Sequence, residues 1–250
     1  MSNLILTQEE GAATVCLARG KVNALNEAVV QELNNTFRDL EKDDRVRAVI
    51  LTGSGKFFSF GFDIPEFLSY SKAEFTQYLD SFSKFSAYLF QFPKPVVAAL
   101  NGHTVAGGCM LAIACDHRIM VEGRAKIALN EIGFGSSVFA GSVEMLRYCT
   151  GSKNAEDMLF SGKMYSAEEA LQIGLIDGVT SVEQLKSEAG MVARKYVDKD
   201  LRAFAGIKGL LRRPVVDRFA GRESDSIGEF VDIWYSESTW KNLEQIKIEK

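Results

Sequence analysis

Apolar residues along the first half of the chain follow two different spacings. Helical spacing of i, i+3 and i+4 predicts one helix after Asn26, which can cap it, and a second helix over residues 75–92, which Pro93 and Pro95 end. Continuous apolar runs at residues 48–51 and 96–100 instead predict strands that are buried on both faces. Strands that alternate with helices in this way are typical of an α/β core.

The two ends of the chain differ from this central region. Residues 4–6 and 14–18 are short apolar segments on either side of a glycine turn, and they predict an antiparallel pair of strands. After about Ser137 the pattern becomes mainly helical, and Ser166 with Glu169 forms a capping-box pattern at one helix start. No Pro/Ser-rich linker interrupts the chain, so the sequence predicts an α/β core followed directly by a helical tail.

Composition narrows the functional classes. The chain has 250 residues, 46% of them hydrophobic, and a formal net charge of -4, which disfavours a nucleic-acid surface because such surfaces need clustered Lys and Arg. Its N-terminus lacks the pattern of a signal peptide, and no apolar run approaches the length of a membrane span. Four cysteines without a CxxC pair predict buried, reduced thiols and a cytoplasmic location. With only two histidines, we expect no metal site.

Two glycine-containing segments carry the candidate chemistry. A predicted loop at residues 56–63 follows the first buried strand, and a predicted turn at residues 102–108 follows the second and leads into a helix. A helix start offers unpaired N–H groups and a positive dipole end, which suit an oxygen that gains negative charge. Either segment alone is better explained as a structural turn that needs glycine only for its backbone conformation or for close packing.

Together and in this order, the two segments resemble the oxyanion-hole motifs of the crotonase (enoyl-CoA hydratase/isomerase) superfamily. The first reads S-F-G-F-D-I after the strand R-A-V-I-L-T-G, and the second reads N-G-H-T-V-A-G-G-C after K-P-V-V-A-A-L. The resemblance covers most of the chain and is weakest after about Asp198. It implies that the backbone N–H groups of Phe62 and Gly107 hold a thioester oxygen. It also implies no cofactor, because coenzyme A is part of the substrate.

The same resemblance implies a fold and an assembly. The expected fold is a crotonase-like spiral of ββα units over residues 1–196, followed by a C-terminal helical trimerisation region over residues 197–250. The expected partners are an acyl-CoA thioester and further copies of the chain, as a homotrimer or a dimer of trimers, with neither nucleic acid nor membrane.

The loop from Gly20 to Asn26 resembles the segment with which family members bind the coenzyme. Lys21 is therefore expected near a phosphate, and Val22 near the pantetheine or adenine; the alternative for Lys21 is a solvated loop lysine. Neighbouring substrate contacts are expected from Phe60, Asp63 and Ile64. Because the family usually has small residues where this chain has Phe60 and Phe62, we expect a narrowed or aromatic-lined pocket mouth.

Carboxylates distinguish the possible reactions. Hydratases of this superfamily place two glutamates across the substrate, and the first of these positions is Met110 here, whose thioether cannot activate water. The second is Glu131, within an L-N-E segment that resembles that of Δ3,Δ2-enoyl-CoA isomerases, which need a single base. Most glutamates are exposed loop residues, so this assignment depends on the resemblance.

The most favoured interpretation is therefore isomerisation of a 3-enoyl-CoA to a 2-enoyl-CoA with Glu131 as the proton shuttle. Two alternatives remain open. One is hydration, or another enolate reaction, with Glu144 recruited from a predicted helix. The other is a non-catalytic relative that only binds acyl-CoA or a protein partner.

Overall fold

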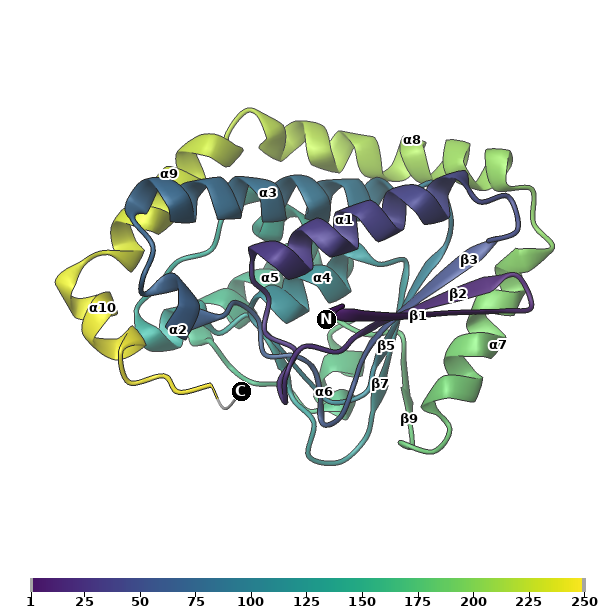
Figure 1. The fold of residues 1–250 in the computed structure, drawn as a ribbon, viewed down its shortest axis with the longest axis horizontal. Helices are drawn as coiled ribbons and strands as arrows, with labels where there is room; N and C mark the ends of the chain where they lie inside the picture. The colour runs from purple at the N-terminus through teal and green to yellow at the C-terminus, as the bar shows by residue number, and fades with distance from the viewer. Residues whose placement is uncertain (1, 249–250) are drawn as a thin grey trace.

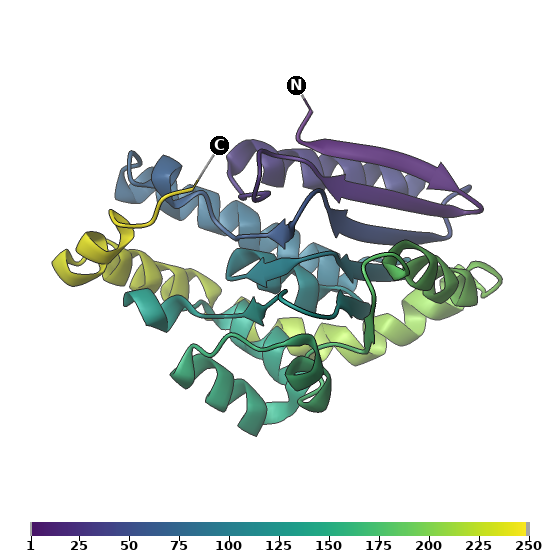
Figure 2. The same cartoon turned by 90° about the horizontal axis from the view of Figure 1, so that it is seen from below.

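The computed structural model describes residues 2–248 and contains two β-sheets. The larger sheet has the strand order β1-β2-β3-β5-β7-β9, and all neighbouring pairs are parallel except β1 and β2. Its strands are β1 (Leu4–Glu9), β2 (Ala12–Leu17), β3 (Ala48–Gly53), β5 (Val96–Leu100), β7 (His117–Val121) and β9 (Gly178–Thr180). In Figure 2, β1 lies beside β2 at one edge of this sheet, as the predicted antiparallel start requires.

The smaller sheet is parallel, with the order β4-β6-β8. Its strands are β4 (Phe57–Ser59), β6 (His103–Val105) and β8 (Ile127–Ala128). Each of them follows a strand of the larger sheet in the sequence, namely β3, β5 and β7, and each pair is followed by a helix. This repetition confirms the predicted spiral of ββα units.

Helices lie on several sides of the strands, with loops along one edge (Figure 1). They are α1 (Glu27–Lys42), α2 (Ile64–Phe67), α3 (Lys72–Gln91), α4 (Gly107–Ala114), α5 (Ala140–Ser161), α6 (Ala167–Gln172), α7 (Leu185–Val197), α8 (Leu201–Ala220), α9 (Glu223–Trp234) and α10 (Glu237–Leu243), with one 3-10 helix, η1 (Glu131–Phe134). Helix α7 contacts β2, β3, β5 and β7, and α1 packs against α3. Within residues 2–248, no helix combines the length and the apolar character needed to cross a membrane.

The predicted helix starts and buried strands are confirmed. Asn26 caps α1 by accepting a hydrogen bond from the N–H of Val29 at 3.1 Å, and Ser166 forms a capping box with Glu169. Every residue of β5 is at most 2% exposed, because β5 lies between β3 and β7. The central run of apolar residues is therefore buried on both faces, as its lack of alternation predicts.

The predicted loop at residues 56–63 and the predicted turn at residues 102–108 are partly wrong. Strand β4 lies within the first segment, and strand β6 lies within the second. Each has only three residues, which is too short to give a periodic signal. These strands hold the two glycine-containing segments side by side, because β4 pairs directly with β6.

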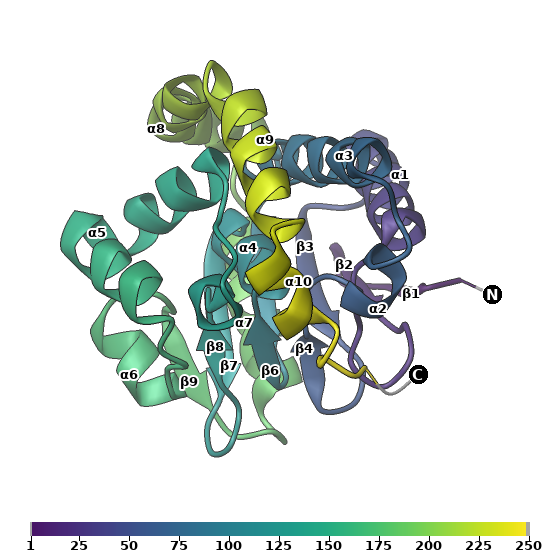
Figure 3. The same ribbon diagram turned by 90° about the vertical axis from the view of Figure 1, so that its left-hand side faces the viewer.

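The C-terminal region after α7 is helical, as predicted. Helix α8 contacts α3 and α5, and α9 contacts α3 and α5, so the helical region packs on the core. Figure 3 shows α9 and α10 on the side of the molecule that also carries β4 and β6. The division at residue 196 and the trimerisation role of this region stay predictions.

Candidate active site

The two glycine-containing segments meet at a cavity of about 120 Å³. One wall comes from the first segment, a second from the end of β6, a third from the residues around η1, and a fourth from the C-terminal region. The lining residues are Phe60, Phe62, Ile64, Val105, Ala106, Asn130, Glu131, Phe134, Phe230, Trp234 and Ile246. Most of these side chains are apolar, so the cavity can exclude water from a bound acyl group.

The backbone around Phe62 is held in an extended conformation by Leu25. The N–H of Leu25 donates to the carbonyl oxygen of Gly61 at 2.7 Å, and the carbonyl oxygen of Leu25 accepts from the N–H of Asp63 at 2.9 Å. Because successive peptide groups of an extended segment point to opposite sides, the N–H of Phe62 points away from Leu25. Among residues 2–248 it has no hydrogen-bond partner, so it remains available as a donor.

Gly107 is the first residue of α4. The first hydrogen bond of this helix runs from the N–H of Met110 to the carbonyl oxygen of Ala106 at 3.0 Å, so the N–H groups before Met110 precede the helical ladder. Ala106 at the N-cap has a φ of 49° and gives no side-chain cap. Within the described chain the N–H of Gly107 is thus an unpaired donor at the positive end of a helix dipole.

The two candidate donor segments are in direct contact. A Cβ added at Gly61 would lie 2.9 Å from the backbone nitrogen of Gly107, and Gly61 also has a φ of +94°. A Cβ added at Gly107 would lie 2.8 Å from Cε1 of Phe62. Glycine is therefore required at both positions, since the backbones could not approach so closely with a larger residue.

Glu131 follows β8 directly and begins η1. Its side chain lines the cavity, the residue is only 4% exposed, and neither carboxylate oxygen has a hydrogen-bond partner within residues 2–248. Burial disfavours the charged form and raises the pKa of Glu131 to about 8. An unpaired carboxyl of this kind, in an apolar cavity, is suited to proton transfer.

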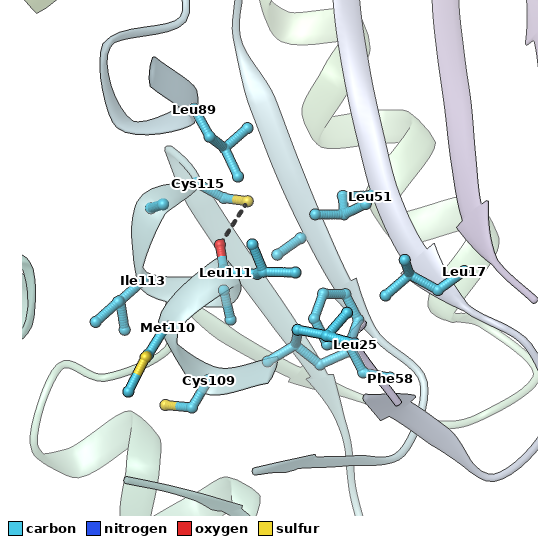
Figure 4. Packing of buried hydrophobic residues seen from close by; sticks show 14 of the residues in the cluster. Leu17, Leu25, Leu51, Phe58, Leu89, Cys109, Met110, Leu111, Ile113 and Cys115 are labelled. Atoms are coloured by element: carbon cyan, nitrogen blue, oxygen red, sulfur yellow. Dashed lines mark hydrogen bonds between the residues drawn. The ribbon is translucent and has the colours of Figure 1, made fainter. Parts of the chain in front are cut away.

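Met110 lies on α4 and is fully buried in the hydrophobic core. Figure 4 shows it beside Cys109 and Ile113, among other buried side chains. It does not belong to the residues that line the cavity. Met110 therefore does not line the cavity beside Glu131, as a substrate contact would require. Its thioether leaves this position on α4 without a second carboxylate, as the sequence indicates.

Glu144 lies on α5 and is also outside the lining of the cavity. Its carboxylate pairs with Arg147 at 3.3 Å, Arg218 at 3.0 Å and Arg222 at 3.2 Å. Burial favours a higher pKa, but the hydrogen bond from Arg218 and the nearby charges outweigh burial, so the pKa of Glu144 is lowered overall. This carboxylate is held by arginines and is not positioned as a second acid for the cavity.

Asp63 does not line the cavity, in contrast to Phe60 and Ile64. Asp63 accepts a hydrogen bond from the N–H of Glu66 at 3.2 Å at the start of α2, and its other oxygen pairs with Arg19 at 2.6 Å. This side chain therefore fixes the first loop, as a structural cap does. Ile64 and Phe60 line the cavity itself.

A groove of about 600 Å³ lies next to the cavity. Its lining residues are Gly20, Lys21, Val22, Ser54, Gly55, Lys56, Phe57, Phe60, Lys247 and Ile248. Phe60 borders both spaces, so the groove and the cavity are neighbours. Lys21 and Val22, which the sequence predicts to contact the coenzyme, both line this groove, together with Lys56 and Lys247.

Sequence reasoning missed several of these residues. Lys56 and Lys247 in the groove, and Phe134, Phe230 and Trp234 in the cavity, belong to no recognised motif. Lys56 follows the glycine-containing turn after β3, which could have suggested a position near the groove. Nothing in the local sequence places Phe230 or Trp234 beside Glu131.

Known proteins resemble this chain over most of its length. The profile of the family described as Enoyl-CoA hydratase/isomerase matches residues 7–229. A short-chain-enoyl-CoA hydratase of Clostridium acetobutylicum is 33% identical over 234 residues, which cover 92% of this chain and 89% of that protein. The mitochondrial enoyl-CoA hydratase of Pongo abelii is 38% identical over 70% of this chain and 59% of its own length.

Solved structures give the same result. The structure of human mitochondrial delta3-delta2-enoyl-CoA isomerase superposes with a TM-score of 0.93 at 28% identity, covering 97% of this chain and 96% of that one. The described residues contain no group of three or more His, Cys, Asp or Glu side chains that could hold a metal ion. The profile match, the relatives and the shared fold agree, and the chain belongs to the enoyl-CoA hydratase/isomerase family.

Proposed function

We propose that this chain is an enoyl-CoA isomerase that moves the double bond of a 3-enoyl-CoA to the 2-position. The observation that carries the proposal is Glu131, the one acidic residue among the described residues that line the cavity. Allylic isomerisation needs one base, whereas the family's hydration mechanism uses two carboxylates. Met110 and Glu144, the other two positions considered, do not line the cavity.

The proposed reaction begins with coenzyme A in the groove and the acyl group in the cavity. The thioester oxygen accepts hydrogen bonds from the N–H groups of Phe62 and Gly107, which increases the acidity of the C2 proton. The Glu131 carboxylate removes this proton, and the electron pair is delocalised over the dienolate. The protonated Glu131 then returns the proton to C4, which leaves the double bond between C2 and C3 and restores the carboxylate.

The environment of Glu131 suits this task. With a pKa of about 8, roughly a tenth of the carboxyl is ionised at pH 7. The ionised fraction is a stronger base than an ordinary glutamate, because burial raises the pKa of Glu131 by more than its own backbone lowers it. A base with a pKa near the working pH can both take and return the proton.

The groove supports an acyl-CoA substrate. Lys21, Lys56 and Lys247 line it, and Val22 offers an apolar contact for the adenine or pantetheine. Phe60 lies at the junction with the cavity, where the thioester would pass. Asp63 acts through the loop that it caps, and Ile64 contributes an apolar wall to the acyl site.

Hydration is the second candidate function. The observation in its favour is that the curated relatives at 33% and 38% identity are hydratases. In this reaction Glu131 alone would have to activate water and supply the proton. The cavity offers no second carboxylate from the described residues for this work.

One assay distinguishes the two reactions. The purified protein is incubated separately with 3-hexenoyl-CoA and 2-hexenoyl-CoA, and products are identified by liquid chromatography with mass spectrometry. Isomerisation gives a product with the mass of the substrate, and hydration gives a product heavier by one water. The isomerase proposal is abandoned if only the hydrated product forms, and acyl-CoA catalysis at this site is abandoned if neither product forms.

The expected homotrimer, or dimer of trimers, is part of the same proposal. Helix α8 exposes three large apolar side chains, since Ile207 is 61% exposed, Leu210 80% and Leu211 57%. Such a row on one helix is suited to a contact between copies of the chain. Sedimentation of the purified protein tests this assembly.

A further inference from the structure

The wall of the cavity that α9 contributes is formed by two aromatic side chains. Phe230 and Trp234 line the cavity from positions i and i+4 of α9, which lie on the same face of the helix, and each is 1% exposed. The Trp234 ring packs against Phe75 at a centroid distance of 4.7 Å, and the Phe230 ring packs against Phe139 at 6.0 Å. Phe75 and Phe139 do not line the cavity, so the wall is backed by further aromatic rings.

Helix α9, which carries this wall, is held at both ends. At its start, the Glu223 carboxylate accepts hydrogen bonds from the N–H of Gly141 at 2.7 Å and from the hydroxyl of Ser83. Just past its end, the hydroxyl of Tyr235 donates to the carbonyl oxygen of Tyr70 at 2.6 Å. Between these points α9 packs against α3 and α5. Moving the wall away from the cavity would therefore break hydrogen bonds and close packing.

Other lining residues belong to the proposed reaction. Phe62, Glu131 and Ala106, which directly precedes Gly107, line the same cavity. Phe60 borders the groove in which the coenzyme is proposed to lie. Isomerisation involves C1 to C4 of the acyl group, so these carbons have to lie between the two N–H donors and the Glu131 carboxyl.

The volume of the cavity leaves little room beyond C4. A dry cavity of about 150 Å³ accommodates one benzene molecule, so the present volume of about 120 Å³ suits a chain of roughly four to six carbons. About two carbons can therefore extend past the reacting part of the chain. A longer chain would have to displace Phe230 or Trp234, both of which belong to the hydrophobic core.

The C-terminal region closes a second side of the cavity. Phe134 and Ile246 both line it. Helix α10 is tied to η1 there, because Thr239 Oγ1 donates to the carbonyl oxygen of Gly135 at 2.6 Å and Asn242 Nδ2 donates to that of Phe134 at 3.1 Å. A long acyl chain could leave on this side only if α10 separated from η1.

We propose that this site accepts acyl groups of up to about six carbons and that Phe230 and Trp234 set this limit. The inference rests on the proposed acyl-CoA function, but not on isomerisation, because hydration would use the same cavity. Carbons beyond the sixth would remain in water or displace packed rings, so they would add no binding free energy. The two aromatic residues are then specificity-determining residues, which contact the end of the acyl chain and take no part in the proton transfer.

Binding of saturated thioesters tests this limit without requiring turnover. Dissociation constants are measured by calorimetry for butanoyl-, hexanoyl-, octanoyl- and decanoyl-CoA. Burial of one CH2 group increases affinity about two- to fourfold, so the wild-type protein should bind hexanoyl-CoA roughly four- to sixteenfold more tightly than butanoyl-CoA. From hexanoyl- to decanoyl-CoA the affinity should stay within about twofold or fall.

The Trp234→Leu variant replaces the indole with a smaller apolar side chain. It should extend the rise in affinity to octanoyl-CoA, because the space left by the indole can take about two further carbons. Phe230→Leu is a smaller change in the same wall and should also favour octanoyl-CoA over hexanoyl-CoA. Trp240→Leu is the matched control, because Trp240 does not line the cavity, and its affinities should still stop rising at six carbons.

Three results would overturn the proposal. The first is a wild-type affinity that keeps rising from hexanoyl- to decanoyl-CoA, or that does not rise from butanoyl- to hexanoyl-CoA; this comparison stands even if neither wall variant folds. The second is a limit that stays at six carbons in the folded wall variants. The third is that no thioester binds more tightly than coenzyme A alone, which would remove the acyl-CoA function itself. Failure of isomerisation alone leaves the binding result intact.

Discussion

The aromatic ring of Phe62 lies directly against Gly107, so that a Cβ on Gly107 would be 2.8 Å from Cε1 of the ring. The ring is itself held by Phe82, at a centroid distance of 5.0 Å, and by Tyr78 at 5.3 Å. Both contacts are edge-to-face, an arrangement that aromatic pairs favour. The side chain of one proposed oxyanion donor therefore packs against the backbone of the other.

Gly107→Ala should disrupt this arrangement. The added methyl group would meet a ring that cannot move freely, so we expect a loss of about 1 to 3 kcal/mol in unfolding free energy. Displacement of the donors should lower kcat by about two orders of magnitude or more. Thermal denaturation and steady-state kinetics on 3-hexenoyl-CoA measure the two effects.

The control and the rescue use other positions. Gly206→Ala places a methyl group in open space on α8 and should leave kcat unchanged. Phe62→Leu replaces the ring that the added methyl group would meet, so the double variant Phe62→Leu with Gly107→Ala should recover part of the stability lost by Gly107→Ala alone. An unchanged kcat in Gly107→Ala would argue against Gly107 as a donor.

The placement of Phe62 also shows which features of the site the sequence can predict. The resemblance implies that the N–H groups of Phe62 and Gly107 hold one oxygen, and the structure places the Phe62 ring against Gly107; the shared oxygen stays a prediction. The prediction of an aromatic pocket mouth is correct in that Phe60 and Phe62 line the cavity. However, the direction of the Phe62 ring, toward Phe82 and Tyr78, depends on the packing of α3, which no local pattern reports.

The same reason explains the residues that were missed. Glu131 was identifiable because it follows a strand within a recognised segment. Phe230 and Trp234 are about 100 residues further along the chain, in the region where the resemblance is weakest, and helical spacing alone explains their apolar character. Glu144 was a candidate second acid, because its three arginine partners become apparent only when α5, α8 and the start of α9 are brought together.

Lysine substitutions in the groove should weaken coenzyme binding. Lys21→Ala and Lys56→Ala should each raise the dissociation constant of coenzyme A about two- to fivefold at low salt, as expected for exposed charges worth about 1 kcal/mol or less. High salt should reduce the difference. Lys186→Ala on the exposed surface of α7 is the control, and an equal effect there would show that only net charge matters.

Glu144→Gln should affect stability and leave catalysis intact. The variant loses the charge that pairs with Arg147, Arg218 and Arg222, which are about half exposed, so the expected loss is about 1 kcal/mol at neutral pH. Because the folded pKa of Glu144 is lowered, this stabilisation is present above the unfolded pKa and is lost as pH falls through the lowered value. A kcat reduced more than about tenfold would restore Glu144 as a catalytic candidate.

Glu131→Gln should stabilise the protein at alkaline pH. Folding raises the pKa of Glu131 from 4.5 to about 8, so the folded state favours the protonated carboxyl. The wild-type protein therefore loses stability progressively as pH rises from about 4.5 to about 8. The uncharged amide has no such loss. Above pH 8 the unfolding free energy of the variant should exceed that of the wild type by a few kcal/mol, on the order of what this difference between folded and unfolded pKa gives.

Urea unfolding at several pH values measures this difference. The two curves should meet near pH 4.5, where both proteins carry an uncharged group at this position in the folded state. Glu168→Gln on the exposed start of α6 serves as the control, because burial does not raise its pKa overall. A Glu131→Gln variant that is less stable than the wild type at every pH would show that the carboxyl is solvated or paired in solution.

The pH dependence of catalysis tests the role of Glu131 directly. If the ionised carboxyl is the base, kcat/KM for 3-hexenoyl-CoA should rise about tenfold per pH unit below pH 8 and level off above it, since the pKa of Glu131 in the free enzyme is about 8.

Glu131→Gln keeps the size of the side chain but cannot accept the proton. It should therefore lower kcat by roughly two to four orders of magnitude and change the affinity for acyl-CoA little. Glu144→Gln should retain both the rate and the profile of the wild type, which separates loss of the base from loss of a buried charge. A Glu131→Gln enzyme that keeps the wild-type rate and the same rise with pH would mean that another group removes the C2 proton, and the one-glutamate mechanism would then have to be replaced.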